Sequence, residues 1–311
     1  MTDVTIGIDI SKDHLDAHRL PGDERRRFDN TAAGHKALVK WISAIPARVV
    51  YEPTGPYHRK MEVQLAAAAM PIVKVNPRQA RRFAEATGQL AKTDRLDAAM
   101  LARMGALLGL EPRPVRTAIL HDLKDLHLAR EALVKNRTAA KNRAKAISLA
   151  LLKRQNEAQL KQIDQQLEAI DEAIARLIAK DPALSQRFAI LVSIPGIAAV
   201  TAAMLVTEMP ELGLLDPKQA AALAGLAPIA RQSGKWNGKA FVQGGRRQVR
   251  QALYMPALVA MRFNPDLKAK YNQLVLAGKA PKQAITTVMR KLIVLANALL
   301  KKGALWQIRR A

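Results

Sequence analysis

Apolar and polar residues alternate with a period of two near the amino terminus, and this alternation predicts the first strand of the fold. The apolar positions are Val4, Ile6, Ile8 and Ile10, and the positions between them are Thr5, Gly7 and Asp9. Because successive side chains of a strand point to opposite faces, Asp9 is expected on the less apolar face. A short turn at residues 11–13 then leads into a second, weaker strand.

The rest of the first hundred residues alternates strand signals with helix signals. The expected elements are an edge strand over Arg25–Asp29, a helix capped at Asn30 and Thr31, a strand over Arg48–Tyr51, a helix over Tyr57–Ala69, a strand over Pro71–Val75, a helix opened by Pro77 and a helix over Thr93–Leu108. Strands that alternate with helices of this length predict an α/β domain over residues 1–112, with helices packed on a central sheet.

Past Pro112 and Pro114 the pattern changes to one of long helices. The stretch from Leu120 to Lys180 contains no Gly or Pro, and leucine and isoleucine recur in it at steps of three and four residues. This spacing predicts amphipathic helices and a central coiled coil over residues 113–184, through which the chain self-associates and contacts nucleic acid. Residues 185–311 are expected to form a mainly α-helical, basic domain.

Two apolar helices are expected on either side of Pro195, Gly196 and Ile197. The arrangement resembles a helix-hairpin-helix, whose turn binds phosphate through backbone N–H groups. Ala198 stands where the second glycine of that hairpin usually lies, so a turn that only packs is the alternative. The uncharged run from Phe188 to Thr207 is long enough to span a bilayer, but the Pro-Gly pair splits it, and we expect a soluble protein with no membrane partner.

Basic residues far outnumber acidic ones, and this points to a class of partner. The chain of 311 residues has 50 Lys and Arg against 26 Asp and Glu, a formal charge of +24 and a pI near 10.6. From Pro228 to Ala311 there are 17 basic residues and a single acid, Asp266. Such an excess is typical of proteins that bind nucleic acid. The chain has no cysteine, which excludes disulfides and thiolate metal sites.

Four carboxylates follow strands or open a helix, and together they suit a two-metal site. They are Asp9, Glu52, Asp94 and Asp97. Hard divalent ions take oxygen ligands that several elements bring together. Asp94 and Asp97 lie three apart, which places them on one face of a helix with Cβ atoms roughly 5–6 Å apart, near enough to serve two ions about 3.5–4 Å apart. Each acid alone also fits a plainer role as a solvated or capping carboxylate.

Two basic stretches are candidates for nucleic-acid contact, with a solvated surface as the alternative for both. The first, on the predicted coiled coil, comprises Lys135, Arg137, Lys141, Arg143 and Lys145. The second comprises Lys235, Lys239, Arg246, Arg247 and Arg250, and it follows Ser233 in a polar segment. A serine attacks phosphorus when its hydroxyl is exposed, loses its proton to a base and faces cations that stabilise the transition state. Loop serines without such a role are common. Trp236 and Phe241 in the same stretch suit either stacking on bases or packing.

Motifs at both ends of the chain resemble those of one known family. GIDISKD, YEPTG and KTDRLDA are similar to the RuvC-like domain at the amino terminus of transposases of the insertion-sequence one-ten (and eleven-eleven) family. QSG, GK, GGRR and VRQALYM are similar to the serine-bearing transposase domain of the same family.

The resemblance implies a fold, a site and partners. It implies an RNase H-like amino-terminal domain whose DEDD acids, Asp9, Glu52, Asp94 and Asp97, hold Mg²⁺, with two ions per site, and a nucleophile, Ser233, that forms a transient covalent link to DNA. It also implies site-specific recombination of donor and target DNA, guided by a noncoding bridge RNA, in a homodimer that assembles to a tetramer. The expected location is the bacterial cytoplasm, in association with the nucleoid. Two rival classes remain open. A structure-specific nuclease or junction resolvase would use the acids without Ser233, and a non-catalytic scaffold would need none of these residues.

Overall fold

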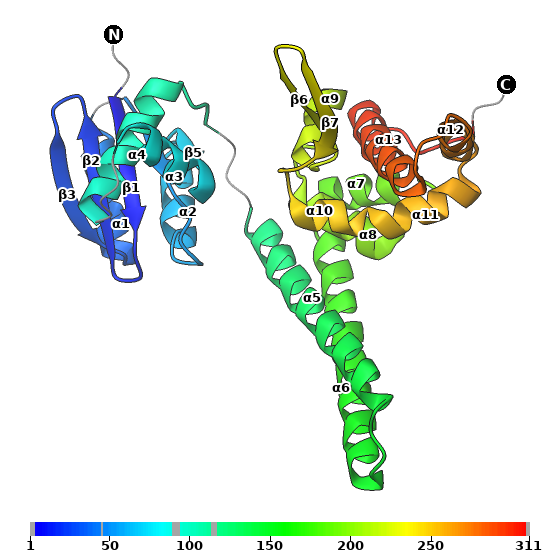
Figure 1. The fold of residues 1–311 in the computed structure, drawn as a ribbon. Coiled ribbons are helices and arrows are strands. Elements are labelled where there is room, and N and C mark those ends of the chain that lie inside the picture. The colour runs from blue at the N-terminus through cyan, green and yellow to red at the C-terminus, as the bar shows by residue number, and fades with distance from the viewer. Residues whose placement is uncertain (1–3, 45, 89–93, 113–116, 309–311) are drawn as a thin grey trace. The chain divides into compact units, whose positions relative to one another are not determined.

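The computed structural model describes residues 4–44, 46–88, 94–112 and 117–308. The chain forms two compact units, Met1–Arg116 and Thr117–Ala311 (Figure 1). Each has its own hydrophobic core, as expected for a chain of this length.

The amino-terminal unit is built on a five-stranded mixed sheet. Its elements are β1 (Val4–Ile10), β2 (His14–Leu20), β3 (Glu24–Asp29), α1 (Ala32–Ile42), β4 (Ala47–Tyr51), α2 (Arg59–Ala67), β5 (Ile72–Lys74), α3 (Pro77–Ala86) and α4 (Asp94–Leu108). The strand order is β3-β2-β1-β4-β5, so β1 is central; it pairs antiparallel with β2 and parallel with β4. The predicted α/β class is confirmed, and the mixed sheet is compatible with an RNase H-like fold.

Helices cover both faces of this sheet (Figure 1). Ile6 and Ile8 face the layer of α1 and α2, where they join a core that includes Leu38 and Leu65. The opposite face, which carries Gly7, is covered by α4. Because β1 is buried on both sides, even its less apolar face is largely shielded from solvent.

The carboxy-terminal unit is mainly helical, as predicted. Its elements are α5 (Ala118–Ala144), α6 (Ala150–Ala179), α7 (Pro182–Val192), α8 (Ala199–Glu208), α9 (Pro217–Leu223), β6 (Pro228–Ser233), β7 (Trp236–Val242), α10 (Arg247–Ala252), α11 (Tyr254–Phe263), α12 (Pro265–Leu276) and α13 (Pro281–Lys302). Strands β6 and β7 form a separate two-stranded ribbon.

Helices α5 and α6 pack against each other as a long hairpin within one chain (Figure 1). The guanidinium of Arg130 donates to both carboxylate oxygens of Asp171, at 2.6 and 3.0 Å, and Arg143 contacts Asn156 nearer the turn. The pairing is therefore antiparallel. The predicted long amphipathic helices are present, whereas a coiled coil between chains stays a prediction.

Leu123 near the start of this hairpin lies in the same core as the later helices. A domain boundary at residue 184 likewise stays a prediction.

The turn at Pro195 and Gly196 lies between α7 and α8 and is packed into the core. Ile194 and Ile197 beside it are buried, and a Cβ at Gly196 would press against the backbone of Pro256 in α11. This geometry favours the packing alternative over an exposed phosphate-binding hairpin. It also places the uncharged run that begins at Phe188 in two separate helices.

Among the described residues, one helix is long and apolar enough to cross a membrane, α13. Its apolar side, which includes Val288, Leu292 and Ile293, is buried in the carboxy-terminal core. A core helix of a globular domain has this composition as well.

Candidate active site

Strands β1 and β4 bring two of the predicted acids to one edge of the sheet. Ile8 pairs with Tyr51 in parallel register, so the next positions, Asp9 and Glu52, continue the same row. Both are partly buried. Asp9 shares its face with Gly7, two residues earlier, because side chains alternate along a strand. Both carboxylates therefore emerge at the carboxyl ends of adjacent parallel strands, where sites of α/β sheets are commonly found.

Helix α4 crosses β1 on the same face. A Cβ at Gly7 would collide with the backbone of Ala98, and a Cβ at Gly105 would meet the side chain of Thr5. The helix therefore runs antiparallel to β1 and passes so close that glycine is required at Gly7. Beyond Ala98, its first turn extends toward the Asp9 end of the strand.

That first turn carries the two remaining acids. α4 begins at Asp94, whose side chain lies outside the described residues. Asp97 is partly buried and immediately precedes Ala98, so it borders the helix face that touches the sheet. Among the side chains that the structure describes, no three acids or histidines enclose a metal position. Carboxylates from β1, from the end of β4 and from α4 are nonetheless the oxygen donor set that Mg²⁺ takes.

Ser233 lies at the exposed end of the β6–β7 ribbon. It is the last residue of β6 and pairs with Trp236, so Gly234 and Lys235 form the two-residue turn. Gly234 has φ of 54°, the left-handed conformation that such a turn requires. Every residue of β6 is exposed, and the hydroxyl of Ser233 is accessible to a large substrate. The sequence pattern predicted a polar, flexible segment around Ser233, whereas the structure has a strand of the ribbon there.

Comparison with protein families agrees with both motif sets. Residues 6–152 match the DEDD domain model of IS110 transposases, described as a transposase, and residues 188–272 match the model described as the transposase IS116/IS110/IS902 family. The chain belongs to the IS110 family of transposases. Membership of this family makes it an enzyme that acts on DNA, a transposase or recombinase, as the motifs predicted.

Two related proteins align with nearly the whole length of this transposase, and a third aligns with about half of it. The transposase is 29% identical over 320 residues to the pilin gene-inverting protein of Moraxella bovis, covering 97% of both chains. The pilin gene-inverting protein of Moraxella lacunata has the same identity and coverage. An IS110 insertion-element protein of 43.6 kDa from Streptomyces coelicolor is 31% identical over 150 residues, covering 47% of this chain and 36% of that one.

A polar cluster in the transposase packs beside Tyr51, the residue that precedes Glu52. Lys74 Nζ lies 2.9 Å from His58 Nε2 and 3.2 Å from a carboxylate oxygen of Glu62, while the Tyr51 ring stacks 6.0 Å from that of His58. Burial, followed by the charge of Lys74, lowers the pKa of His58 to about 4, so its imidazole is neutral at pH 7. Burial, followed by the charge of Glu62, raises the pKa of Tyr51. These groups clamp the segment that follows Glu52 and were not identified from the sequence.

The sequence also gave no indication of a second acid beside Asp9. Strand β2 places Asp16 directly opposite Asp9, and Arg27 of β3 donates two hydrogen bonds to the Asp16 carboxylate, at 2.9 and 2.8 Å. Directly opposed like charges destabilise a strand pair, and the guanidinium of Arg27 offsets this repulsion.

The basic residues predicted to contact nucleic acid fall into two structural groups. Arg246 forms a fork with the Glu211 carboxylate, at 2.8 and 2.6 Å, and also donates to the backbone oxygen of Glu208. Arg250 donates to the backbone oxygen of Gly244 at 2.8 Å. These two guanidiniums hold the base of the ribbon. The side chains of Lys235, Lys239, Arg247, Lys141 and Lys145 are exposed or partly exposed.

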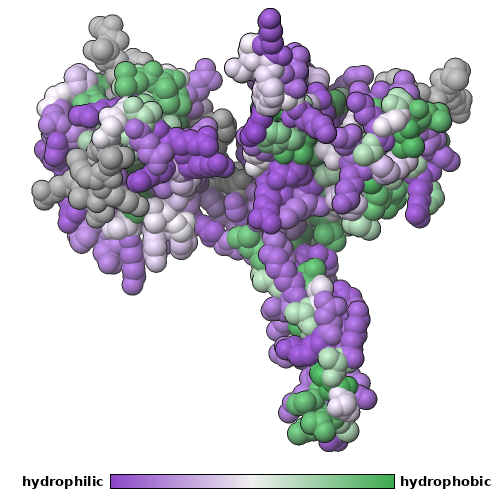
Figure 2. All heavy atoms as spheres, in the orientation of Figure 1, coloured by the Kyte–Doolittle hydropathy of each residue, from purple (hydrophilic) through white to green (hydrophobic). Residues whose placement is uncertain are grey.

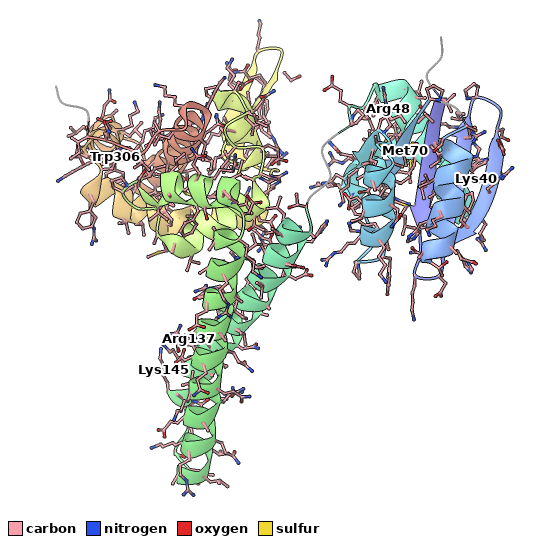
Figure 3. All side chains as sticks on the ribbon, turned by 180° about the vertical axis from the view of Figure 1, so that it is seen from behind. Lys40, Arg48, Met70, Arg137, Lys145 and Trp306 are labelled. Atoms are coloured by element: carbon pink, nitrogen blue, oxygen red, sulfur yellow. The ribbon has the colours of Figure 1, made fainter. Side chains whose placement is uncertain are left out.

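On the α5–α6 hairpin, too, some of the basic residues are paired with acids and others are exposed. Arg137 is paired with Asp164 at 3.0 Å and Lys135 with Glu131 at 2.8 Å. Lys145 lies near the far end of the hairpin, where Figure 3 labels it. Hydrophobic side chains gather at that end (Figure 2), among them the exposed Leu149, Leu151 and Leu152.

Proposed function

We propose that this transposase recombines donor and target DNA by RNA-guided strand exchange, with the four acids as an Mg²⁺ site and Ser233 as the nucleophile. The observation that supports it most is the parallel register of β1 and β4, which sets Asp9 beside Glu52. The close passage of α4 over Gly7 then directs the turn bearing Asp94 and Asp97 to the same end of the sheet.

The acids of this site suit a divalent ion. DEDD transposases generally depend on one, and Asp9, Glu52, Asp94 and Asp97 would hold it here, two ions being the number that the spacing on α4 suits. A bound Mg²⁺ would supply charge stabilisation to the phosphoryl group. The cluster of His58, Glu62 and Lys74 would fix the chain that follows Glu52.

The step proposed for Ser233 is a transesterification. Its Oγ bonds to a DNA phosphorus atom while one ester oxygen of that phosphate leaves, and the hydroxyl proton passes to a base as the leaving oxygen gains one. The exposed end of the ribbon, with Lys235 in the turn, allows a phosphate to approach Ser233. The exposed Trp236 beside it offers a base-stacking surface.

The proposal also includes an RNA guide and an assembly of several subunits. A noncoding bridge RNA would select donor and target DNA, for which the motif resemblance and the formal charge of +24 are the support. A homodimer that assembles to a tetramer would combine the acids of one subunit with Ser233 of another. A relative named for inverting a pilin gene supports site-specific exchange over simple hydrolysis.

The test is recombination between donor and target plasmids in Mg²⁺, with and without RNA transcribed from the noncoding sequence that flanks the gene. The variants are Ser233→Ala and Asp9→Asn. Their matched controls are Gln232→Ala, on the same exposed strand, and Asp13→Asn, in the exposed turn after β1. Joined products should require RNA, Mg²⁺, Ser233 and Asp9, and should tolerate both controls.

The products distinguish the proposal from its rival. A covalent protein–DNA adduct that forms with wild type and is absent from Ser233→Ala supports the serine mechanism. Metal-dependent cleavage that persists in Ser233→Ala without an adduct would instead identify a nuclease that uses the four acids alone. Products that form without RNA would refute guidance.

A further inference from the structure

A row of charged side chains extends from the proposed acidic site across the sheet. Asp9 of β1 lies opposite Asp16 of β2, which lies opposite Arg27 of β3. All three are on the face that α4 crosses, because cross-strand partners share a face. Two residues earlier along β1, Gly7 lies opposite His18 of β2, which lies opposite Arg25 of β3, on the same face.

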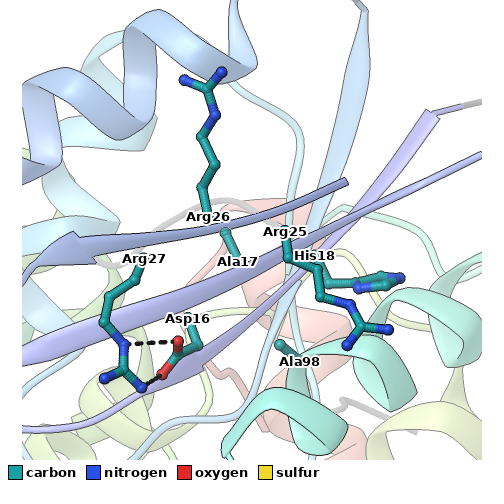
Figure 4. Close-up of a pocket in the computed structure, with 7 residues that line it drawn as sticks. All are labelled: Asp16, Ala17, His18, Arg25, Arg26, Arg27 and Ala98. Atoms are coloured by element: carbon teal, nitrogen blue, oxygen red, sulfur yellow. Dashed lines mark hydrogen bonds and ion pairs between the residues drawn. The ribbon is translucent and has the colours of Figure 1, made fainter. Parts of the chain in front are cut away.

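A hollow of about 250 Å³ opens beside α4, over β2 and β3. The side chains of Asp16, His18, Arg25, Arg27 and Ala98 line it, and at Ala17 and Arg26 the strands border it with their side chains turned to the other face. Figure 4 shows the side chains of Arg25 and Arg27 on the side of Asp16 and Ala98, whereas that of Arg26 points to the opposite face. There the Arg26 guanidinium lies 5.7 Å from the ring centroid of Trp41.

The hollow presents more positive than negative charge. Arg25 and Arg27 have side chains that are 53% and 50% exposed, and Arg103 of α4 is close enough to affect the charge of His18. Two acids face these three guanidiniums. Asp16 is paired with Arg27, and Asp23 lies 3.1 Å from His18 and 3.4 Å from Arg25.

His18 forms the buried floor of this hollow, with a side chain that is 2% exposed. Burial lowers its pKa, as do Arg25 and Arg103, while Asp23 acts in the opposite direction. A neutral imidazole has one ring N–H, and that of His18 is directed to Asp23, whose Oδ1 lies 3.1 Å from Nε2. The donors that the hollow offers to an anion are therefore the guanidiniums at its rim, and guanidinium forks match the geometry of a phosphate.

We propose that this hollow binds a backbone phosphate of the DNA strand that enters the acidic site, with Arg25 as its principal contact. The assignment rests on the proposed function, because the bound strand is taken to run from the hollow to the neighbouring acidic site at Asp9. Strand β2 lies between β1, which carries Asp9, and β3, which carries Arg25, so one continuous DNA backbone would supply both the scissile phosphate and the held phosphate.

Arg25 is the residue to change, because removing Arg27 would leave Asp16 buried beside Asp9. The variants are Arg25→Gln and, as a matched control on the same strand, Arg26→Gln, whose side chain faces away. Full-length protein is bound to short single-stranded DNA and to RNA of the same sequence in EDTA. Affinity is followed as a function of salt, and phosphate ethylation interference locates the contacts.

Arg25→Gln should bind DNA on the order of ten-fold more weakly and lower the salt-dependence slope by about one. It should also lose interference at one phosphate, whereas Arg26→Gln should match wild type in all three measurements. An Arg25→Gln protein with unchanged affinity and footprint overturns the proposal, and so does an effect confined to RNA.

These outcomes are independent of the proposed chemistry. If Asp9→Asn recombines normally while Arg25→Gln loses its phosphate contact, the proposed function fails and the phosphate site stands. If Asp9→Asn is inactive while Arg25→Gln binds and recombines like wild type, the acidic site stands and the phosphate site fails.

Discussion

Gly7 shows how one residue can fix the position of a helix over a candidate site. The backbone of α4 occupies the space that any larger side chain at Gly7 would need. The same close approach sets the end of α4 that carries Asp97 near Asp9. Glycine is needed here because it leaves space for the backbone of α4, and not because the chain adopts an unusual backbone conformation.

Gly7→Ala should therefore lower the free energy of unfolding by about 1–3 kcal/mol, the cost of overpacking a tight interface. Gly105→Ala should cost less, because its added methyl group meets methyl groups of the Thr5 and Val50 side chains instead of backbone atoms. Urea unfolding of the two full-length variants compares them directly. An unchanged midpoint for Gly7→Ala would contradict the packing argument.

At this scale the sequence predicted the acids but not their neighbours. Asp9 and Glu52 were recognisable because each stands at the end of an apolar strand pattern. Asp16 was not, because its place beside Asp9 depends on the register of β1 with β2. His58 and Lys74 come together only when α2 folds against β5. The residues next to a histidine in the sequence do not indicate a partner that lies farther along the chain.

Among the elements, the β6–β7 ribbon depends on its base. Isolated two-stranded ribbons are marginal in water, and both strands are largely exposed. The fork between Arg246 and Glu211 ties the end of the segment after β7 to the loop after α8. This arrangement separates two adjacent arginines into different roles, since Arg247 is exposed.

Arg246→Gln should lower the free energy of unfolding by about 1–3 kcal/mol, because a charge-assisted fork is lost and Glu211 is left without it. Arg247→Gln should stay within about 0.5 kcal/mol of wild type and should weaken DNA binding instead. Thermal unfolding and DNA binding of the two variants, measured side by side, provide the check. A reversed pattern would show that Arg246 is the DNA contact and Arg247 the anchor.

Most elements could be predicted from the hydrophobic pattern, and the β6–β7 ribbon is an exception. The edge strand expected over Arg25–Asp29 is β3, which begins one residue earlier, and the helix expected over Thr93–Leu108 is α4. The ribbon was missed because two exposed strands have no apolar face, so hydrophobic periodicity is silent there. Strand order was also unpredictable, since long-range pairing leaves no local signal.

For the whole molecule, DNA binding should depend on salt, whereas strand cleavage should depend on the metal ion. With a formal charge of +24, binding should depend steeply on salt, and contacts to six to ten phosphates would reduce affinity about 10³- to 10⁵-fold between 50 and 200 mM. EDTA should abolish strand cleavage and leave the affinity for DNA nearly unchanged. Filter binding and cleavage assays on the same samples measure both. Equal loss of binding and cleavage in EDTA would mean that the metal organises DNA binding itself.

The central place of β1 has a consequence for how the molecule opens. Strands pair with β1 on both of its edges and helices cover both of its faces, so its amide hydrogens can exchange with solvent only when the whole unit unfolds. The ribbon that carries Ser233 can fray while the rest of its unit stays folded. Asp9 would then be held on the slowest-exchanging strand of the protein, and the serine on one of its fastest.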